Sequence, residues 1–222
     1  MKETKSLVAE FIGTFGLIFI GGGAVTVHAL TNGGVGLVGI GLAHGLLLLA
    51  MIYALAGISG AHFNPAVTIA MIVNKRIEFS KGIAYILSQL LGASFAAFAL
   101  KLIFPVATAE QIFGFPTSID LITGIMVEAL LTFFLVFVVY GVAVSKKATP
   151  TVFGLAIGGT IIFDIMMGGN ITGAAMNPAR AFGPAIASGI MTTQIIYWAG
   201  PILGALLGSF VGEWLFKEDK NQ

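Results

Sequence analysis

The sequence predicts an all-α membrane protein with six transmembrane helices, two re-entrant half-helices and an inverted internal repeat. Composition is the first reason, because 57% of the 222 residues are hydrophobic and only 9% are charged, whereas about a quarter of a soluble domain is charged. No charged residue occurs between Glu10 and Lys75. The second reason is the length of the apolar runs, and the third is a motif that occurs twice. The runs are continuous, which excludes a β-barrel of alternating strands about 10 residues long.

Net charge and cysteine content exclude several classes of function. The formal net charge of +1 provides no basic surface for a nucleic acid. The chain has no cysteine, so it cannot form a disulfide, a thiolate metal site or a redox centre at sulfur. We therefore expect no metal, no cofactor and no nucleic-acid partner, and we expect a lipid bilayer around the protein.

Six apolar runs reach the length of about 20 residues that a membrane-spanning helix needs. The first contains Glu10 and is followed by further spans, so we expect a retained helix and not a cleaved signal. The longest connection is 105–118. Two more apolar stretches, 65–74 and 178–188, cover only half a bilayer at 1.5 Å per residue. The six full-length runs are 7–30, 35–57, 80–104, 119–145, 149–169 and 193–216.

The basic residues predict the orientation of the chain. If six helices cross and both short stretches re-enter, all basic residues except Lys101 and Arg180 fall on one side. That side is cytoplasmic by the positive-inside rule, which places both termini in the cytoplasm, with the cell membrane as the expected location. The residues on that side are Lys2, Lys5, Lys75, Arg76, Lys81, Lys146, Lys147, Lys217 and Lys220.

The chain contains two similar halves. ISGAHFNPA at 58–66 recurs as ITGAAMNPA at 171–179, and GLAHGLLL at 41–48 recurs as GLAIGGTI at 154–161, both offset by 113 residues. Each half has three spans and one half-span, so the second half is inserted upside down. Such inverted repeats place their functional site near the bilayer midplane. We expect one channel domain over residues 1–222, with repeat one at about 7–104 and repeat two at about 119–216.

The repeated Asn-Pro-Ala is a helix start. Asparagine is a preferred N-cap and proline suits the first helical position, so half-helices should begin at Pro65 and Pro178 and present positive N-terminal ends to each other. The alternative is two unrelated helix caps, but recurrence in matching halves argues against it. The residues before each cap must be unwound, which is tolerated where they line a water-filled cavity or are buried in protein. Their free carbonyls are expected to line a pore, at Gly60, Ala61, His62, Gly173, Ala174 and Ala175.

These features resemble the aquaporin, or major intrinsic protein, family, and in particular its water-channel, prokaryotic-like members. The resemblance covers about residues 7–216. It implies a passive channel for water or small neutral solutes, usually a homotetramer, and not an enzyme. The segments that carry it are AEFIGTF at 9–15, SGAHFNPAVT at 59–68, MNPARAFGPA at 176–185 and YWAGPILGA at 197–205.

The resemblance assigns roles to the Asn-Pro-Ala residues and to four filter positions. Asn64 and Asn177 would donate hydrogen bonds to a passing water, each followed by its Pro and Ala (Pro65, Ala66, Pro178, Ala179). Arg180 would be the filter cation that repels protons and ions. The other filter positions fall at His44, Ile165 and Ala174. Histidine and isoleucine resemble the filter of plant vacuolar members, which also pass ammonia and urea. The alternative interpretation of His44 is a buried core histidine. The alternative interpretation of Arg180 is a structural ion pair.

Two carboxylates occupy matching places in the repeats, because AEFIGTFGLIF at 9–19 resembles VEALLTFFLVF at 127–137, offset by 118 residues. The resemblance implies that Glu10 and Glu128 accept hydrogen bonds from the unwound segments, with proton coupling as the alternative. Asp164 has no assigned role and is expected near the outer end of its helix. His62 should line the inner vestibule through its carbonyl, and His28 should be interfacial.

Alternatives to a water channel are a glycerol facilitator and a proton-coupled secondary transporter. The family's glycerol channels usually have an acid directly after the filter arginine and a basic residue four positions later, where this chain has Ala181 and Ala185. Tyr197-Trp198 also matches the water-channel type. A coupled transporter would need titratable groups at the half-helix tips, which offer only asparagine and carbonyls. An intramembrane enzyme using Ser59 and His62 lacks an oriented base.

Overall fold

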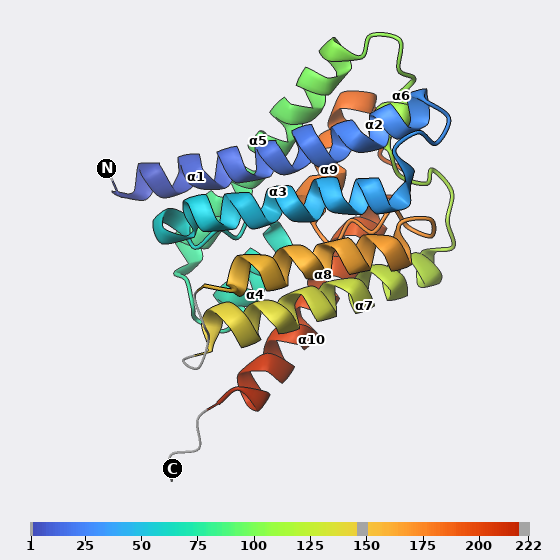
Figure 1. The fold of residues 1–222 in the computed structure, drawn as a ribbon. Coiled ribbons are helices and arrows are strands. Elements are labelled where there is room, and N and C mark those ends of the chain that lie inside the picture. The colour runs from blue at the N-terminus through green and yellow to red at the C-terminus, as the bar shows by residue number, and fades with distance from the viewer. Residues whose placement is uncertain (1, 146–150, 218–222) are drawn as a thin grey trace.

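A computed structural model describes residues 2–145 and 151–217. Within these ranges every regular element is helical. Figure 1 shows α1, α3, α8 and α7 as a row of neighbouring ribbons, with α5 and α10 crossing behind them. The elements are α1 (Lys2–Gly16), η1 (Leu17–Gly22), α2 (Gly23–Leu30), α3 (Gly36–Ser59), α4 (Pro65–Val73), α5 (Phe79–Ile103), α6 (Ala109–Phe113), α7 (Leu121–Val139), η2 (Tyr140–Val144), α8 (Phe153–Gly168), α9 (Pro178–Ser188) and α10 (Gln194–Leu215).

Five of the six predicted spans are long enough to cross a membrane. The π-helical turns η1 and η2 continue their helices, which gives spans Glu3–Leu30 and Leu121–Val144. The predicted span 149–169 is wrong in length, because α8 has only 16 residues and at 1.5 Å per residue covers about 24 Å of a core about 30 Å thick. Residues 149 and 150 lie outside the described ranges, as do Lys146, Lys147 and Lys220 of the orientation argument.

The connection 105–118 contains a short helix that its apolar pattern does not predict. Thr108 caps α6 through its hydroxyl, which accepts from the Gln111 backbone N–H at 3.3 Å. The Gln111 side chain accepts in return from the Thr108 backbone N–H at 2.9 Å. This reciprocal capping box satisfies two free backbone donors, which makes so short a helix possible.

The two half-helices lie inside the bundle, where α4 packs on α10 and α5, and α9 packs on α5 and α10. Their far ends are held differently. Behind α4, the Arg76 guanidinium donates to both oxygens of Glu213 at 2.7 and 2.8 Å. At the end of α9, the Lys101 ammonium donates to the Ala187 carbonyl at 2.8 Å, where a cation suits a helix C-terminus.

Glycines allow α3 and α8 to approach each other closely. A Cβ at Gly45 of α3 would collide with the Gly158 carbonyl of α8, and one at Gly158 would collide with the Gly45 carbonyl. Close backbone contact through small residues is the usual way in which helices pack in lipid.

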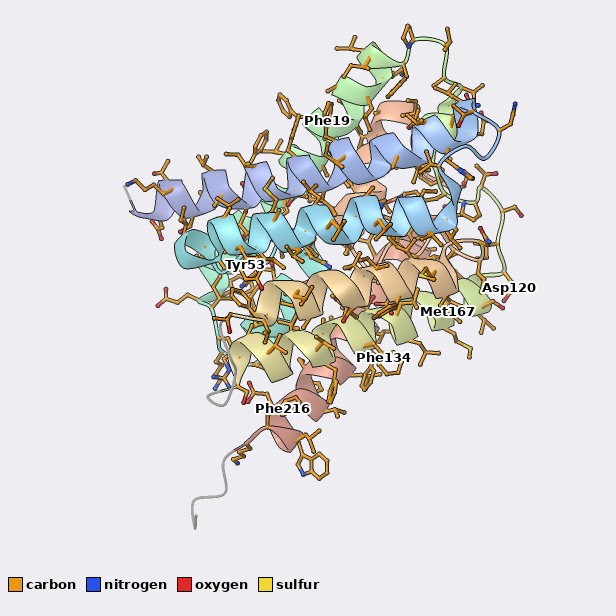
Figure 2. All side chains as sticks on the ribbon, in the orientation of Figure 1. Phe19, Tyr53, Asp120, Phe134, Met167 and Phe216 are labelled. Carbon is orange, nitrogen blue, oxygen red and sulfur yellow. The ribbon has the colours of Figure 1, made fainter. Side chains whose placement is uncertain are left out.

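The outside of the bundle is apolar, as lipid requires. Phe134 and Met167 project from the outer faces of α7 and α8 (Figure 2), with exposed fractions of 55% and 59%. Buried polar residues lie on the inside instead, among them Glu10, His44, Gln89 and Glu128. The protein is thus an integral membrane protein whose polar groups gather at its centre.

Candidate pore and selectivity filter

Each half-helix begins at an asparagine cap followed by proline. The Asn64 side-chain oxygen accepts from the Ala66 backbone N–H at 2.8 Å. The Asn177 oxygen accepts from the Ala179 and Arg180 backbone N–H groups at 3.0 and 3.3 Å. Both caps are extended, with φ of −155° and −153°. Extended backbone before a proline is favoured sterically, so the local sequence itself sets where α4 and α9 begin.

The tips of the two half-helices are hydrogen-bonded to each other. The Asn64 amide nitrogen donates to the Met176 carbonyl at 2.8 Å, and that of Asn177 donates to the Phe63 carbonyl at 2.9 Å. The resemblance assigns both amide groups to a passing water, but part of each is already engaged in the protein. A side-chain amide has two N–H donors, so one donor of each asparagine fixes the opposite loop and one remains.

The unwound segments before the caps have the same backbone conformation. In each, three residues have positive φ, a region that costs non-glycine residues of order 1–3 kcal/mol. The φ values are 93°, 53° and 48° at Gly60, Ala61 and Phe63, and 85°, 47° and 53° at Gly173, Ala174 and Met176.

Glu10 holds the first unwound segment in place. Its carboxylate is fully buried and accepts from the backbone N–H groups of His62 at 3.0 Å and Phe63 at 2.7 Å. The Ser59 hydroxyl donates to it at 2.6 Å and the Gln89 amide at 2.7 Å. Bonds to an ionised acceptor are the strong ones, so four donors both compensate the buried charge and oppose the backbone strain.

Glu128 holds the second segment in the same way. It is fully buried and accepts from the Ala175 and Met176 backbone N–H groups at 2.9 and 2.7 Å and from the Thr172 hydroxyl at 2.6 Å. Asp164 of α8 also interacts electrostatically with Glu128. The Asp164 side chain is only 7% exposed, and its Oδ2 has no hydrogen-bond partner within the described chain.

Arg180 is tethered on two sides. Its Nε donates to His44 Nε2 at 3.0 Å, and its Nη1 donates to the carbonyls of Gly173 and Ala174 at 3.0 and 2.6 Å. The guanidinium also lies 5.0 Å from the centre of the Phe115 ring. The carbonyls of Gly173 and Ala174 were expected to face the pore freely, and this is corrected: both hold Arg180. Its third nitrogen, Nη2, makes no hydrogen bond to the described residues.

The hydrogen bonds of His44 fix its tautomer. Nε2 accepts from Arg180, so the ring proton lies on Nδ1, which is 2.9 Å from the Ile40 carbonyl and donates to it. The ring is 1% exposed and packs on the first helix where η1 contains Gly21, since a Cβ there would collide with the imidazole. Both nitrogens are therefore engaged, and only carbon atoms of His44 remain to face a solute.

One cavity of about 220 Å³ connects these residues. It is lined at one end by His44, Ile165, Ala174 and Arg180, passes both asparagines, and extends to Phe153 and Val144 at the other end. Of the predicted carbonyl residues, Gly60, Ala61, His62 and Ala175 line it as well.

The structure also shows where His62, His28 and Asp164 lie relative to the cavity and which partners the two histidines have. The His62 ring lies 3.1 Å from the Thr68 hydroxyl, so its side chain as well as its backbone has a structural partner. His28 is in the last turn of α2, and its Nδ1 accepts from the Gly36 N–H at 3.1 Å. Asp164 lies in the C-terminal part of α8, next to Ile165, but is not in the cavity wall.

Sequence reasoning missed several residues of the site. Gln89, Gly21 and Phe115 lie far along the chain from the residues they support, and nothing in their local sequence marks them. Ser59 and Thr172 could have been found, because they occupy the same position in the two repeats.

A helical bundle in which two asparagine-capped half-helices meet along an internal cavity defines a membrane channel. Comparison with known proteins identifies the particular family. The family model described as "Major intrinsic protein" matches residues 1–212, and the chain belongs to this family. Its members are channels and not enzymes.

The relatives of this chain include plant proteins that are named as aquaporins of the NIP type. Aquaporin NIP1-1 of Zea mays is 40% identical over 206 residues, which cover 93% of this chain and 73% of the relative. Putative aquaporin NIP4-1 of Arabidopsis thaliana is 38% identical over 98% of this chain and 76% of the relative. Among solved structures, the aquaglyceroporin of Plasmodium falciparum matches with a TM-score of 0.79 and 27% identity over 96% of this chain and 95% of that one.

Proposed function

We propose that this channel passes water together with small neutral solutes, such as ammonia, urea or glycerol, and excludes protons and ions. The observation that carries the proposal is the tethered Arg180 at one end of the cavity. Its charge and the two half-helix N-termini repel cations. Its Nη2 and the second N–H of each asparagine remain as donors along the path.

The chemistry of the filter residues favours the passage of small neutral solutes as well as water. Opposite the Arg180 donor, His44 offers only carbon atoms, and Ile165 and Ala174 have hydrocarbon side chains. One polar side and three apolar ones suit a small molecule that accepts a hydrogen bond on one face and is less polar on the other. The likeness to a solved aquaglyceroporin supports the same conclusion, although Ala181 and Ala185 differ from the usual glycerol-channel residues.

Stopped-flow light scattering on proteoliposomes tests this proposal. We expect faster shrinkage than in empty liposomes under an impermeant osmolyte, and recovery of volume with glycerol or urea. An imposed pH gradient should persist, whereas a proton-coupled transporter would collapse it during solute entry. Solute flux no faster than in empty liposomes, or proton movement with solute, contradicts the proposal.

We also propose a homotetramer in the cell membrane with both termini cytoplasmic. The start of α1, the start of α8 and the end of α10 lie toward one end of the bundle in Figure 1, and α6 lies at the other. Lys217 follows the end of α10, and the hydrogen bonds of Arg76 to Glu213 hold Lys75 and Arg76 near the same end, which supports the orientation under the positive-inside rule. Protease protection of terminal tags in sealed vesicles would test the orientation, chemical cross-linking would test the homotetramer, and fractionation of cell membranes would test the location.

A further inference from the structure

The repeat offset of 113 residues gives every filter residue a counterpart in the other half of the chain. His44 corresponds to Ile157, and Arg180 to Val67. The remaining two pairs are Ile165 with Ile52 and Ala174 with Ala61. We call Ile52, Ala61, Val67 and Ile157 the inner ring.

The structure places the inner ring in positions equivalent to those of the filter. Val67 and Arg180 each lie three residues after a capping asparagine, on half-helices whose preceding segments have matching φ values. Ala61 and Ala174 both have positive φ, of 53° and 47°. All four inner-ring residues line the same cavity as the filter. The inner ring therefore surrounds the path on the opposite side of the asparagine pair.

The two rings differ in chemistry. The filter contains the Arg180 guanidinium, whereas all four inner-ring side chains are hydrocarbon. The nearby wall of Gly60, Ala61 and His62 adds backbone acceptors, but the four side chains of the inner ring donate no hydrogen bond. A water molecule beside the ring therefore has fewer partners than it has beside Arg180.

We propose that the inner ring is a second specificity-determining element, which slows water relative to solutes that carry carbon atoms. This inference rests on the proposed function. An apolar wall cannot replace the hydrogen bonds that a water molecule gives up, and each such bond is worth about 1 kcal/mol net. Glycerol, in contrast, can place its C–H groups against the ring and keep its hydroxyls toward the backbone acceptors.

Nearly isosteric hydroxyl substitutions test the inference in the full-length protein. Val67→Thr and Ile157→Thr each add one hydroxyl to the inner ring from a different helix, so that each variant serves as the check if the other fails to fold. Val136→Thr is the matched control, because Val136 is fully buried in α7 and is not in the cavity wall. Osmotic water permeability and glycerol permeability are measured by stopped-flow light scattering on the same proteoliposomes.

We expect the ratio of water to glycerol permeability to rise about threefold in each inner-ring variant and to stay constant in Val136→Thr. An unchanged ratio in a folded inner-ring variant, or an equal rise in the control, would overturn the inference while leaving the proposed function intact. Wild-type liposomes that conduct neither water nor glycerol would overturn both.

Discussion

The unwound segment before α4 and the one before α9 have nearly the same backbone but different surroundings. Their φ values agree within about ten degrees at each matching position, and each is held by a buried glutamate. A tyrosine hydroxyl donates to the start of each, from Tyr85 to the Ser59 carbonyl at 2.9 Å and from Tyr197 to the Thr172 carbonyl at 2.8 Å. The scaffold of the tips is thus duplicated almost completely.

The differences lie in the side chains that complete each scaffold. Glu10 receives a fourth donor from Gln89 of α5, four residues after Tyr85, whereas the residue four positions after the matching Tyr197 of α10 is Pro201, which has no side-chain amide. Glu128 has Asp164 nearby, where the first half has Met51. The duplicated hydrogen bonds thus give the two tips the same backbone shape, while the unmatched side chains place different charged and polar groups around them.

Neutralising the two glutamates should have the largest effect. We expect Glu10→Gln to lower the free energy of unfolding by about 3 kcal/mol or more, and Glu128→Gln by less, because charge-assisted bonds are worth about 1.5–3 kcal/mol each and Glu10 has one more donor. Thermal unfolding in detergent measures both, with Glu110→Gln, at an exposed position of α6, as control. A greater loss in Glu128→Gln would mean that Gln89 adds nothing to the first tip.

A thiol placed in either unwound segment should make flux sensitive to mercury. The chain has no cysteine, and soft Hg²⁺ needs a thiolate, so wild-type water flux should be unaffected. Ala174 and Ala61 both line the cavity and have similar positive φ values. A cysteine should therefore cause similar backbone strain at the two positions. We expect mercury to block Ala174→Cys and Ala61→Cys almost completely, with recovery in reductant. If Ala174→Cys is modified yet conducts normally, the assigned filter must be redrawn.

Replacing Arg180 by valine gives the filter the side chain that the inner ring has at Val67. We expect Arg180→Val to raise proton or cation leak by about tenfold or more, since it removes the main electrostatic barrier at the filter. Dissipation of a pH gradient in proteoliposomes measures the leak. The control is Arg76→Gln, which removes a cation that is not part of the cavity wall. Background leak in a folded Arg180→Val protein would show that the half-helix dipoles suffice.

Asp164→Asn should have the smallest effect and the opposite sign on stability. The buried Asp164 Oδ2 has no hydrogen-bond partner among residues 2–145 and 151–217, and the carboxyl is within electrostatic range of the Glu128 carboxyl. An amide removes the ionisable group, so we expect the free energy of unfolding to rise by about 1 kcal/mol with water flux unchanged, because the residue is not in the cavity wall. A fall in the thermal midpoint would instead indicate that the carboxyl supports the second tip.

The sequence by itself determined the membrane class, the two re-entrant stretches and the position of both caps. These follow from hydropathy and from the preferences of asparagine and proline at helix starts, which depend on a few neighbouring residues. The predictions from the sequence differ from the structure where local signals are weak. Within the described residues, the predicted 149–169 span is longer than α8, which runs from Phe153 to Gly168. The short helix α6 depends on a reciprocal side-chain cap between Thr108 and Gln111.

Only the tertiary structure decided which polar atoms are used. The side-chain amides of Asn64 and Asn177 each donate one hydrogen bond to a carbonyl more than 100 residues away. Arg180 is oriented by its hydrogen bond to His44, 136 residues earlier in the chain. Such bonds exist only because packing brings α3, α4 and α9 together, and no pattern of neighbours along the chain encodes their geometry. The physical reason is that a buried donor must find an acceptor in the folded protein, and the fold alone determines which acceptors are within reach.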